Sequence, residues 1–248
     1  MYIQIQIHDV ILMQDLGDLR EGYYNTAELI NTALWIEEDC KALNLKGIGT
    51  NLGCYGSIVP DAENLGTLVQ IARQIEARIG RPLDWVSGGS TTTLPLIHDG
   101  SIVSGINHVR IGDAIFLRDM ELYYDYHFEG MHDDAIILEA EIVELKTKPS
   151  HPVGTITLDA FNNRPVYEDI GEHQRALLAV GRQDIGDMMK LLPEDEGIRL
   201  IGGSSDHTII DVTNAEGSYQ VGDILRFKLQ YEHIVFASAS IYVVKVFE

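Results

Sequence analysis

The chain changes its pattern near the middle, and this change limits the folds open to it. Up to about residue 118, short apolar runs alternate with amphipathic helical stretches; beyond about residue 135, apolar runs follow one another with little helical periodicity between them. The first pattern predicts parallel strands with helices packed outside them, and the second predicts an antiparallel β domain. We therefore expect an α/β unit over residues 1–126 and an all-β unit over residues 135–248, joined by the polar stretch 126–134.

Each half yields specific elements. In the first half, apolar runs predict strands at 10–13, 47–52, 83–87 and 109–117, and the alternating residues 2–7 predict a half-exposed strand. Helical spacing predicts helices over 26–43 and 64–79, the first capped by Asn25 or Thr26. In the second half, strands are predicted at 136–145, 176–180, 198–201, 209–212, 224–229 and 241–246.

The number of parallel strands leaves two architectures open. Four or five strands in the first half fit an open doubly wound sheet. They also fit part of a closed (β/α)₈ barrel, which needs roughly 250 residues.

Composition excludes several classes of partner. The formal charge of −20, from 38 acidic and 18 basic side chains, argues against nucleic acid or an anionic membrane as a partner. No apolar run approaches the ~20 residues of a membrane span. We also expect no signal peptide, because no basic segment precedes a short apolar run at the N-terminus. Two cysteines, Cys40 and Cys54, make no disulfide framework, so we expect a cytoplasmic protein.

Polar residues follow several of the predicted strands, where α/β folds bind ligands. They occur as DLGDLREG at 15–22, SGGSTTTL at 87–94 and VRIGD at 109–113, and in the second half as GRQD at 181–184 and SSDH at 204–207. Each also fits a polar loop, a turn or a surface salt bridge. His127 and His132 lie beside two aspartates, but their spacing fits no metal-binding helix face, so we expect a solvated linker and no metal.

The order of these motifs is more specific than any one of them. From about residue 8 to 246 the chain resembles the pyridoxal-phosphate amino-acid racemases of the alanine racemase family, most closely the ornithine-racemase-like branch. The resemblance rests on DLGDLREG, GIGTNLGCYG, SGGSTTTL, NHVRIGDAIFL, AVGRQDIG, GSSDHTIIDV and YQVGDIL. It implies a (β/α)₈ barrel followed by a β domain, an amino acid as the small-molecule substrate, and a homodimer in which each active site is completed by the partner.

The resemblance also implies which residues bind the cofactor, pyridoxal 5'-phosphate (PLP). Arg110 matches the arginine that faces the pyridine nitrogen. The residues that match the phosphate site are Ser90, Thr91, the backbone amides of Gly112 and Asp113, and, by a looser match, Tyr242. An arginine stays protonated and gives the ring no full proton, which leaves a weaker electron sink and suits a racemase.

Other matches concern the substrate. Arg20 matches an arginine that supports the substrate carboxylate, and Asn51 stands where alanine racemases place a histidine near the ring. Ser205 and Asp206 match a Met-Asp pair that the partner subunit supplies. Arg182 and Asp184 belong to GRQD, where alanine racemases have GYAD, so Arg182 replaces the tyrosine that is their second base, and the identity of the second base stays open.

The Schiff-base lysine of the family lies at the end of the first barrel strand, whereas this chain matches from the fourth strand onward. None of its lysines precedes the Arg20 motif; they are Lys41, Lys46, Lys146, Lys148, Lys190, Lys228 and Lys245. We therefore expect a fragment of a racemase, acting on a basic amino acid such as ornithine. The alternative is a non-catalytic protein on the same scaffold that binds PLP or another phosphorylated small molecule.

Overall fold

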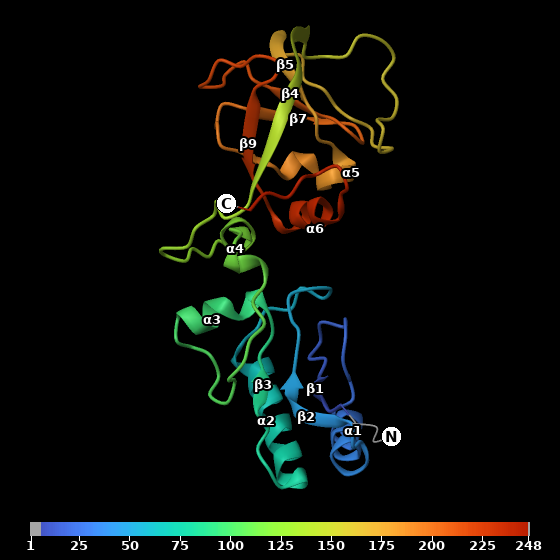
Figure 1. The fold of residues 1–248 in the computed structure, drawn as a ribbon, viewed down its shortest axis with the longest axis vertical. Helices are drawn as coiled ribbons and strands as arrows, with labels where there is room; N and C mark the ends of the chain where they lie inside the picture. The colour runs from blue at the N-terminus through green and yellow to red at the C-terminus, as the bar shows by residue number, and fades with distance from the viewer. Residues whose placement is uncertain (1–5, 248) are drawn as a thin grey trace. The chain divides into compact units, whose positions relative to one another are not determined.

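The computed structural model describes residues 6–247, and the chain divides into two compact units, Met1–Ile115 and Phe116–Glu248. Figure 1 traces the chain through both. The division falls earlier in the chain than the polar stretch 126–134 in which the sequence places it. Within residues 6–247, no helix combines the length and the apolarity that crossing a bilayer requires.

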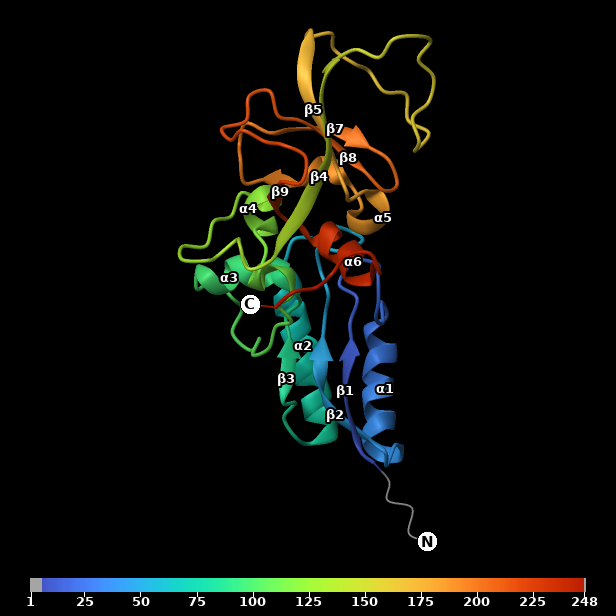
Figure 2. The same cartoon turned by 45° about the horizontal axis from the view of Figure 1, so that its top comes forward.

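Unit 1 is built on a parallel sheet of three strands in the order β1-β2-β3. The strands are β1 (His8–Met13), β2 (Leu43–Gly49) and β3 (Trp85–Ser87). Helix α1 (Thr26–Asp39) joins the first two strands and α2 (Ala62–Ile79) joins the second and third. Figure 2 shows both helices running alongside the strands. These are strand–helix–strand units of the kind that the sequence predicts.

The two helices cover one face of this sheet. They pack against each other and both contact β2. Their buried side chains recur at helical spacing, as Leu29 and Ala33 do on α1 and Leu68 and Ile75 on α2. Val10 and Leu12 of β1 pack against this core, whereas the core of the described residues does not include Ile11 or Met13. Since side chains alternate along a strand, those two belong to the face that the helices leave open.

Local signals set the helix ends. The Asn25 side chain accepts a hydrogen bond from the N–H of Ala27, which confirms Asn25 as the cap of α1. Asp61 and Asn64 form a capping box on α2, and Gly80 ends that helix with φ of 74°. The prediction that the first helix extends to residue 43 is wrong. Helix α1 ends at Asp39 because the following residues turn into β2, which begins at Leu43.

One predicted strand of the first half is absent, and another lies largely outside the described residues. Over 109–117 the chain forms no strand but a 3₁₀ turn, η2 (Asp113–Ile115), and just before this range His108 makes an isolated parallel bridge to Ser87. The pairing stops after this bridge and two backbone bonds, from the Gly88 N–H to the His108 carbonyl and from the Arg110 N–H to the Gly89 carbonyl, because the chain then closes the turn η2 through the Ile115 N–H bond to the Gly112 carbonyl. Of the predicted strand 2–7, residues 2–5 lie outside the described residues, and residues 6 and 7 are not in a strand.

Unit 2 contains a curled antiparallel sheet of six strands in the order β6-β9-β4-β5-β8-β7. The strands are β4 (Ile137–Pro149), β5 (Glu172–Leu178), β6 (Leu192–Pro193), β7 (Arg199–Gly203), β8 (Thr208–Asp211) and β9 (Ile224–Lys228). The long strand β4 pairs with β9 over 137–141 and with β5 over 142–149, and the register shifts near Ile142. The antiparallel β domain that the sequence predicts is confirmed.

Helices also occur in unit 2, and one predicted strand does not. They are α4 (Asp119–Tyr124), α5 (Arg182–Ile185) and α6 (Tyr231–Ala239). The prediction of a strand over 241–246 is wrong: this segment follows α6 without strand structure. The N–H of Tyr242 and the ammonium of Lys245 bond to Ser240 instead. Residues with high β-propensity form a strand only where a neighbouring strand can pair with them, and the hydrogen bonds of this segment are local.

Candidate functional site

Arg110 lies across the carboxyl ends of β2 and β3. Its Nη1 donates a hydrogen bond to the Ser87 hydroxyl, and its Nη2 donates to the Thr50 carbonyl at 2.7 Å. Gly49 makes room for this arrangement, since a Cβ there would lie 3.1 Å from the Ser87 Cβ and 3.4 Å from Nη1. Burial lowers the pKa of Arg110 from its ordinary value, yet a guanidinium remains a cation at neutral pH. A fixed positive charge therefore occupies the end of the sheet where α/β folds bind ligands.

The two predicted phosphate-binding segments meet beside Arg110. They lie in the turn η1 (Thr91–Thr93) with the helix α3 (Leu94–His98) that follows it, and in η2. The Thr91 hydroxyl donates to the Asp113 carboxylate, and the Gly112 N–H donates to the Thr91 hydroxyl at 3.3 Å. Space around Gly112 is open, because a Cβ there would meet no atom within 4 Å. Ser90 is half-buried, and its hydroxyl has no hydrogen bond among the described residues.

Asp18 organises the loop beyond β2. Its carboxylate is 1 % exposed and accepts four backbone N–H bonds, at 3.0–3.4 Å, from Gly53, Cys54, Tyr55 and Ile58. Burial opposes ionisation of this group, but these bonds outweigh it and lower the pKa of Asp18. The DLGDLREG loop is thereby tied to the loop that follows Asn51.

Asn51 and Arg20 lie on these two loops. The Asn51 side chain is buried and donates to the Cys54 sulfur at 3.0 Å. Arg20 is exposed and pairs with Glu21, which raises the pKa of Arg20. Besides burial, Glu21 raises the pKa of Arg110 and Arg20 lowers it, so the charges of the DLGDLREG loop act on Arg110. The structure thus brings together seven of the predicted site residues in unit 1: Arg20, Asn51, Ser90, Thr91, Arg110, Gly112 and Asp113.

The other five predicted residues gather in unit 2. The N–H groups of Arg182 and Gln183 donate to the Ser204 and Ser205 carbonyls at 3.1 and 2.9 Å, so the GRQD and SSDH turns are in contact. Only glycine fits at 181, because a Cβ there would lie 2.4 Å from the Asp206 nitrogen. Asp206 is exposed, and its carboxylate accepts hydrogen bonds from the Ser204 and Ser205 hydroxyls.

Arg182, Asp184 and Tyr242 complete this group. The Arg182 guanidinium stacks 4.2 Å over the ring of Phe161, a residue of the long β4–β5 connection. Asp184 is buried and accepts hydrogen bonds from the Gly181 N–H and from the Ser240 hydroxyl, the latter at 2.8 Å. Tyr242 donates its N–H to the same hydroxyl, while its side chain is exposed. Arg182 therefore presents a fixed cation at this turn, and the buried acid Asp184 holds the segment that carries Tyr242.

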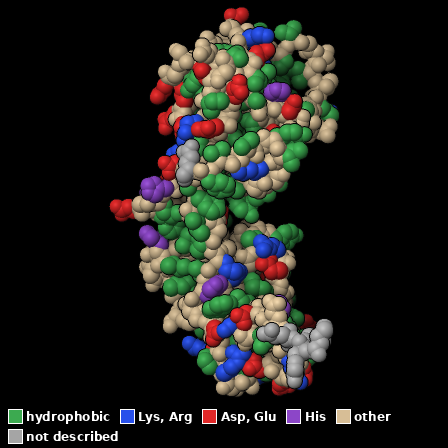
Figure 3. Space-filling model, viewed as in Figure 1, with side chains coloured by type: hydrophobic (Ala, Val, Ile, Leu, Met, Phe, Trp, Pro, Cys, Tyr) green, Lys and Arg blue, Asp and Glu red, His purple; other side chains and the backbone are tan. Residues whose placement is uncertain are grey.

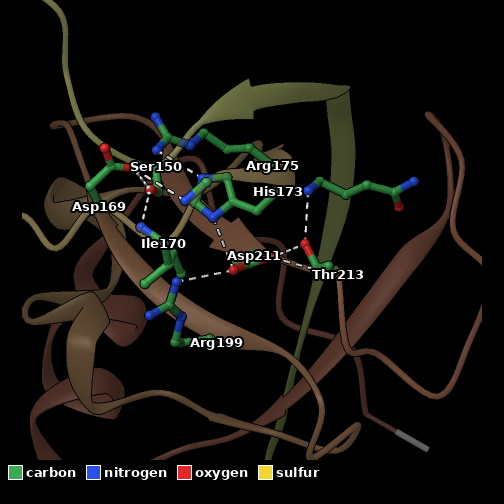
Figure 4. Close-up of polar contacts among 10 residues, drawn as sticks. Ser150, Asp169, Ile170, His173, Arg175, Arg199, Asp211 and Thr213 are labelled. Atoms are coloured by element: carbon green, nitrogen blue, oxygen red, sulfur yellow. Dashed lines mark hydrogen bonds and ion pairs between the residues drawn. The ribbon is translucent and has the colours of Figure 1, made fainter.

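A polar network that the motifs do not reveal lies near the start of β5 (Figure 4). It is separate from the Arg182 turn, which follows the end of β5. His173 and Asp211 are buried, and their Nδ1 and Oδ2 atoms are 3.0 Å apart. The Arg175 Nη2 lies 3.1 Å from the other ring nitrogen of His173. Because a guanidinium only donates, that nitrogen accepts, and Nδ1–H donates to Asp211. Arg199 and Thr213 also bond to Asp211, so this network links β5, β8 and β7.

The surface of unit 2 carries charges of both signs. Figure 3 shows acidic and basic side chains interspersed over this unit, with hydrophobic side chains gathered around α4. There Leu122, Tyr123 and Tyr124 are exposed. His127 and His132 are exposed and lie 3.6 Å from Glu121 and 3.8 Å from Asp134. Within residues 6–247, no group of three His, Cys, Asp or Glu side chains could hold a metal ion.

No family model matches the chain. It is 42 % identical over 242 residues to ornithine racemase of Acetoanaerobium sticklandii, covering 97 % of this chain and 67 % of that protein. The chain belongs to this racemase family. It is also 38 % identical over 239 residues to lysine racemase of Thermotoga maritima, covering 96 % of this chain and 65 % of the relative. The chain thus spans about two thirds of the length of the curated relatives it matches.

Solved structures show the same fold at much lower identity. D-threonine aldolase from Filomicrobium marinum matches with a TM-score of 0.61 at 14 % identity, over 93 % of this chain and 56 % of that one. Alanine racemase from Streptomyces lavendulae matches with a TM-score of 0.60 at 14 % identity, over 94 % and 62 %. Alanine racemase from Bartonella henselae, solved with covalently bound pyridoxal phosphate, matches with a TM-score of 0.54 at 17 % identity, over 93 % and 60 %. The resemblance that the motifs indicate is therefore confirmed.

Proposed function

We propose that this chain acts in the interconversion of L- and D-amino acids with PLP as cofactor, on a basic amino acid such as ornithine. The observation that carries the proposal is the cluster around Arg110, in a chain that shares 42 % of its residues with an ornithine racemase. A cation, hydroxyl groups and glycine-lined backbone converge at the carboxyl ends of parallel strands. Such a set of groups suits an anionic, phosphate-bearing ligand.

The residues of unit 1 fit PLP. Ser90, Thr91 and the N–H groups of Gly112 and Asp113 would hold the phosphate, and the open space around Gly112 leaves room for it. Arg110 would face the pyridine ring. When bound, PLP withdraws electrons from the substrate α-carbon and so acidifies its proton. Arg110 keeps its own proton, which limits that withdrawal and favours return of a proton over side reactions.

The remaining residues would act on the substrate. Arg20 would bind the α-carboxylate, and Asn51, held beside Cys54, would border the cofactor ring. In unit 2, Arg182, Asp184, Ser205, Asp206 and Tyr242 form a second polar group, which we propose completes the site of a partner subunit in a homodimer. Arg182 is a poor base, because a guanidinium holds its proton. Its stacking on Phe161 suits a role in binding an anion.

Lysines bear on whether unit 1 catalyses by itself. Its two lysines are Lys41, which precedes β2, and Lys46, which pairs with Asp84 at 2.7 Å beside the start of β3. Arg110 lies against Ser87, where β3 ends. Neither lysine is therefore at the end of the sheet that holds the cluster. Racemisation needs an acid or base on each face of the α-carbon, so we propose that unit 1 by itself binds PLP reversibly and that catalysis requires groups from outside it.

We also propose that the sheet of unit 1 is part of a (β/α)₈ barrel. Its helices cover one face, and the apolar residues Ile11 and Met13 of β1 belong to the other. In a closed barrel that face is the interior, which is filled by side chains of this kind. The likeness to alanine racemase structures over 93–94 % of this chain supports the same arrangement.

The test is racemisation of L-ornithine and L-lysine with added PLP, followed by chiral chromatography. The variant Arg110→Ala is compared with Arg73→Ala, which removes an exposed arginine from α2. We expect the first to abolish D-isomer formation and PLP binding, and the second to leave both unchanged. PLP binding without racemisation of either amino acid would leave the chain a binding protein on this scaffold. No PLP binding by the unaltered chain would refute the proposal.

A further inference from the structure

His108 contacts Arg110 through one buried hydroxyl. The Ser87 side chain is 0 % exposed, and its Oγ lies 2.8 Å from Nδ1 of His108. The same Oγ accepts the hydrogen bond from Nη1 of Arg110. The imidazole also stacks on the ring of Trp85, with centroids 5.4 Å apart and 27° between the planes. His108 is thus fixed on two sides, next to the residue that anchors the guanidinium.

The direction of each bond follows from the groups involved. A guanidinium only donates, so Ser87 accepts from Arg110 and keeps one O–H to place. His108 Nδ1 is the other partner of this hydroxyl among the described residues. If Nδ1 carried a proton and donated it, the Ser87 proton would be a buried donor without an acceptor, which is unfavourable. The arrangement that satisfies every group has Nδ1 accepting from Ser87 and the ring proton on Nε2.

We propose that His108 is a positioning residue for Arg110, acting through Ser87. By accepting the Ser87 proton, His108 fixes a lone pair of Oγ toward Nη1, while the Thr50 carbonyl fixes Nη2. Two acceptors then hold the guanidinium plane in one orientation. The inference rests on the proposed function in one respect, since the ligand that Arg110 would face is PLP.

A pair of substitutions separates the acceptor from the ring. His108→Asn supplies an acceptor oxygen near the position of Nδ1 and removes the ring, whereas His108→Phe keeps a ring against Trp85 and removes the acceptor. PLP affinity is measured by titration with fluorescence detection, and folding by urea unfolding of each variant. We expect His108→Phe and Ser87→Ala to weaken PLP binding by about tenfold, the effect of one lost hydrogen bond, and His108→Asn to stay within about threefold of the unaltered chain.

A second measurement reads the proton directly and needs no cofactor. Nitrogen-15 NMR of the unliganded chain, with the His108 signals assigned by their loss in His108→Asn, should show Nε2 protonated and Nδ1 free of a proton. A protonated Nδ1, or full PLP affinity in a folded His108→Phe variant, overturns the proposal that His108 positions Arg110 through Ser87. If the unaltered chain binds no PLP, the proposed function fails. The tautomer of His108 then decides by itself: a proton on Nε2 supports the positioning role, and a proton on Nδ1 rejects it.

Discussion

Replacing Asp18 by asparagine should destabilise unit 1 strongly, although the two side chains have nearly the same shape. Oδ1 accepts from Gly53, Cys54 and Ile58, and Oδ2 accepts from Tyr55. An asparagine oxygen can take over the first set, but its NH₂ group then faces the Tyr55 N–H, donor against donor. One unpaired buried donor costs about 1–3 kcal/mol, and the loss of charge weakens the remaining bonds. We expect the free energy of unfolding to fall by about 2–4 kcal/mol.

Tryptophan fluorescence during urea unfolding measures this change, since the two tryptophans, Trp35 and Trp85, both lie in unit 1. The matched control is Asp39→Asn, which neutralises an exposed carboxylate at the end of α1 and should change stability by less than about 0.5 kcal/mol. Equal stability of Asp18→Asn and the control would refute the account of the loop.

The same pair of proteins tests the pH dependence. The pKa of Asp18 is lower in the folded chain than in the unfolded one. Its contribution is therefore complete above the ordinary aspartate value of about 3.9 and is lost as the pH falls through the folded value. The unaltered chain should lose more stability than Asp18→Asn as the pH is lowered through this range. Parallel pH profiles for the two proteins would show that Asp18 makes no such contribution.

Three further predictions concern other parts of the chain. Asp211→Asn should destabilise unit 2 in thermal unfolding. Hydrogen bonds from Thr213 and Arg199 outweigh burial and lower the pKa of Asp211, so the difference in stability between the two proteins should shrink as the pH falls below about 4. Phe161→Ala should release the Arg182 guanidinium and lower the free energy of unfolding by about 0.5–1 kcal/mol. The NMR signals of the guanidinium should become sharper as it moves more freely, and unchanged signals would exclude the stacking. Asn25→Ala should cost about 1 kcal/mol in the tryptophan assay through loss of the α1 cap, and Asn25→Gly a few tenths.

The sequence predicts the elements whose side-chain spacing matches their burial. Helix α2 is an example, because its apolar residues recur on one face and its capping residues mark both ends. Helix α6 carries no such signal: among its side chains only His233 is buried, and that residue is held by hydrogen bonds to the backbone of Gln230 and Asp187. Its formation depends on contacts that are distant in sequence.

The same distinction applies to the candidate site. Arg110 and Thr91 are recognisable from the order of the motifs, and the structure brings them to the same end of the sheet. The importance of Asp18 cannot be recognised from the sequence, because its four hydrogen-bond partners are backbone groups that lie 35 to 40 residues further along the chain. His173 and Asp211 escaped notice for a similar reason, since they are 38 residues apart and meet only when β5 pairs with β8.

The central claim is that the groups around Arg110 form a binding site for PLP. The most direct measurement is a PLP titration of the purified chain, followed by tryptophan fluorescence and by the absorbance of the cofactor, with Arg110→Ala and Arg73→Ala titrated alongside. The account predicts saturable binding by the unaltered chain and by Arg73→Ala, and loss of binding in a folded Arg110→Ala variant. Equal binding by all three proteins, or none by the unaltered chain, would contradict it.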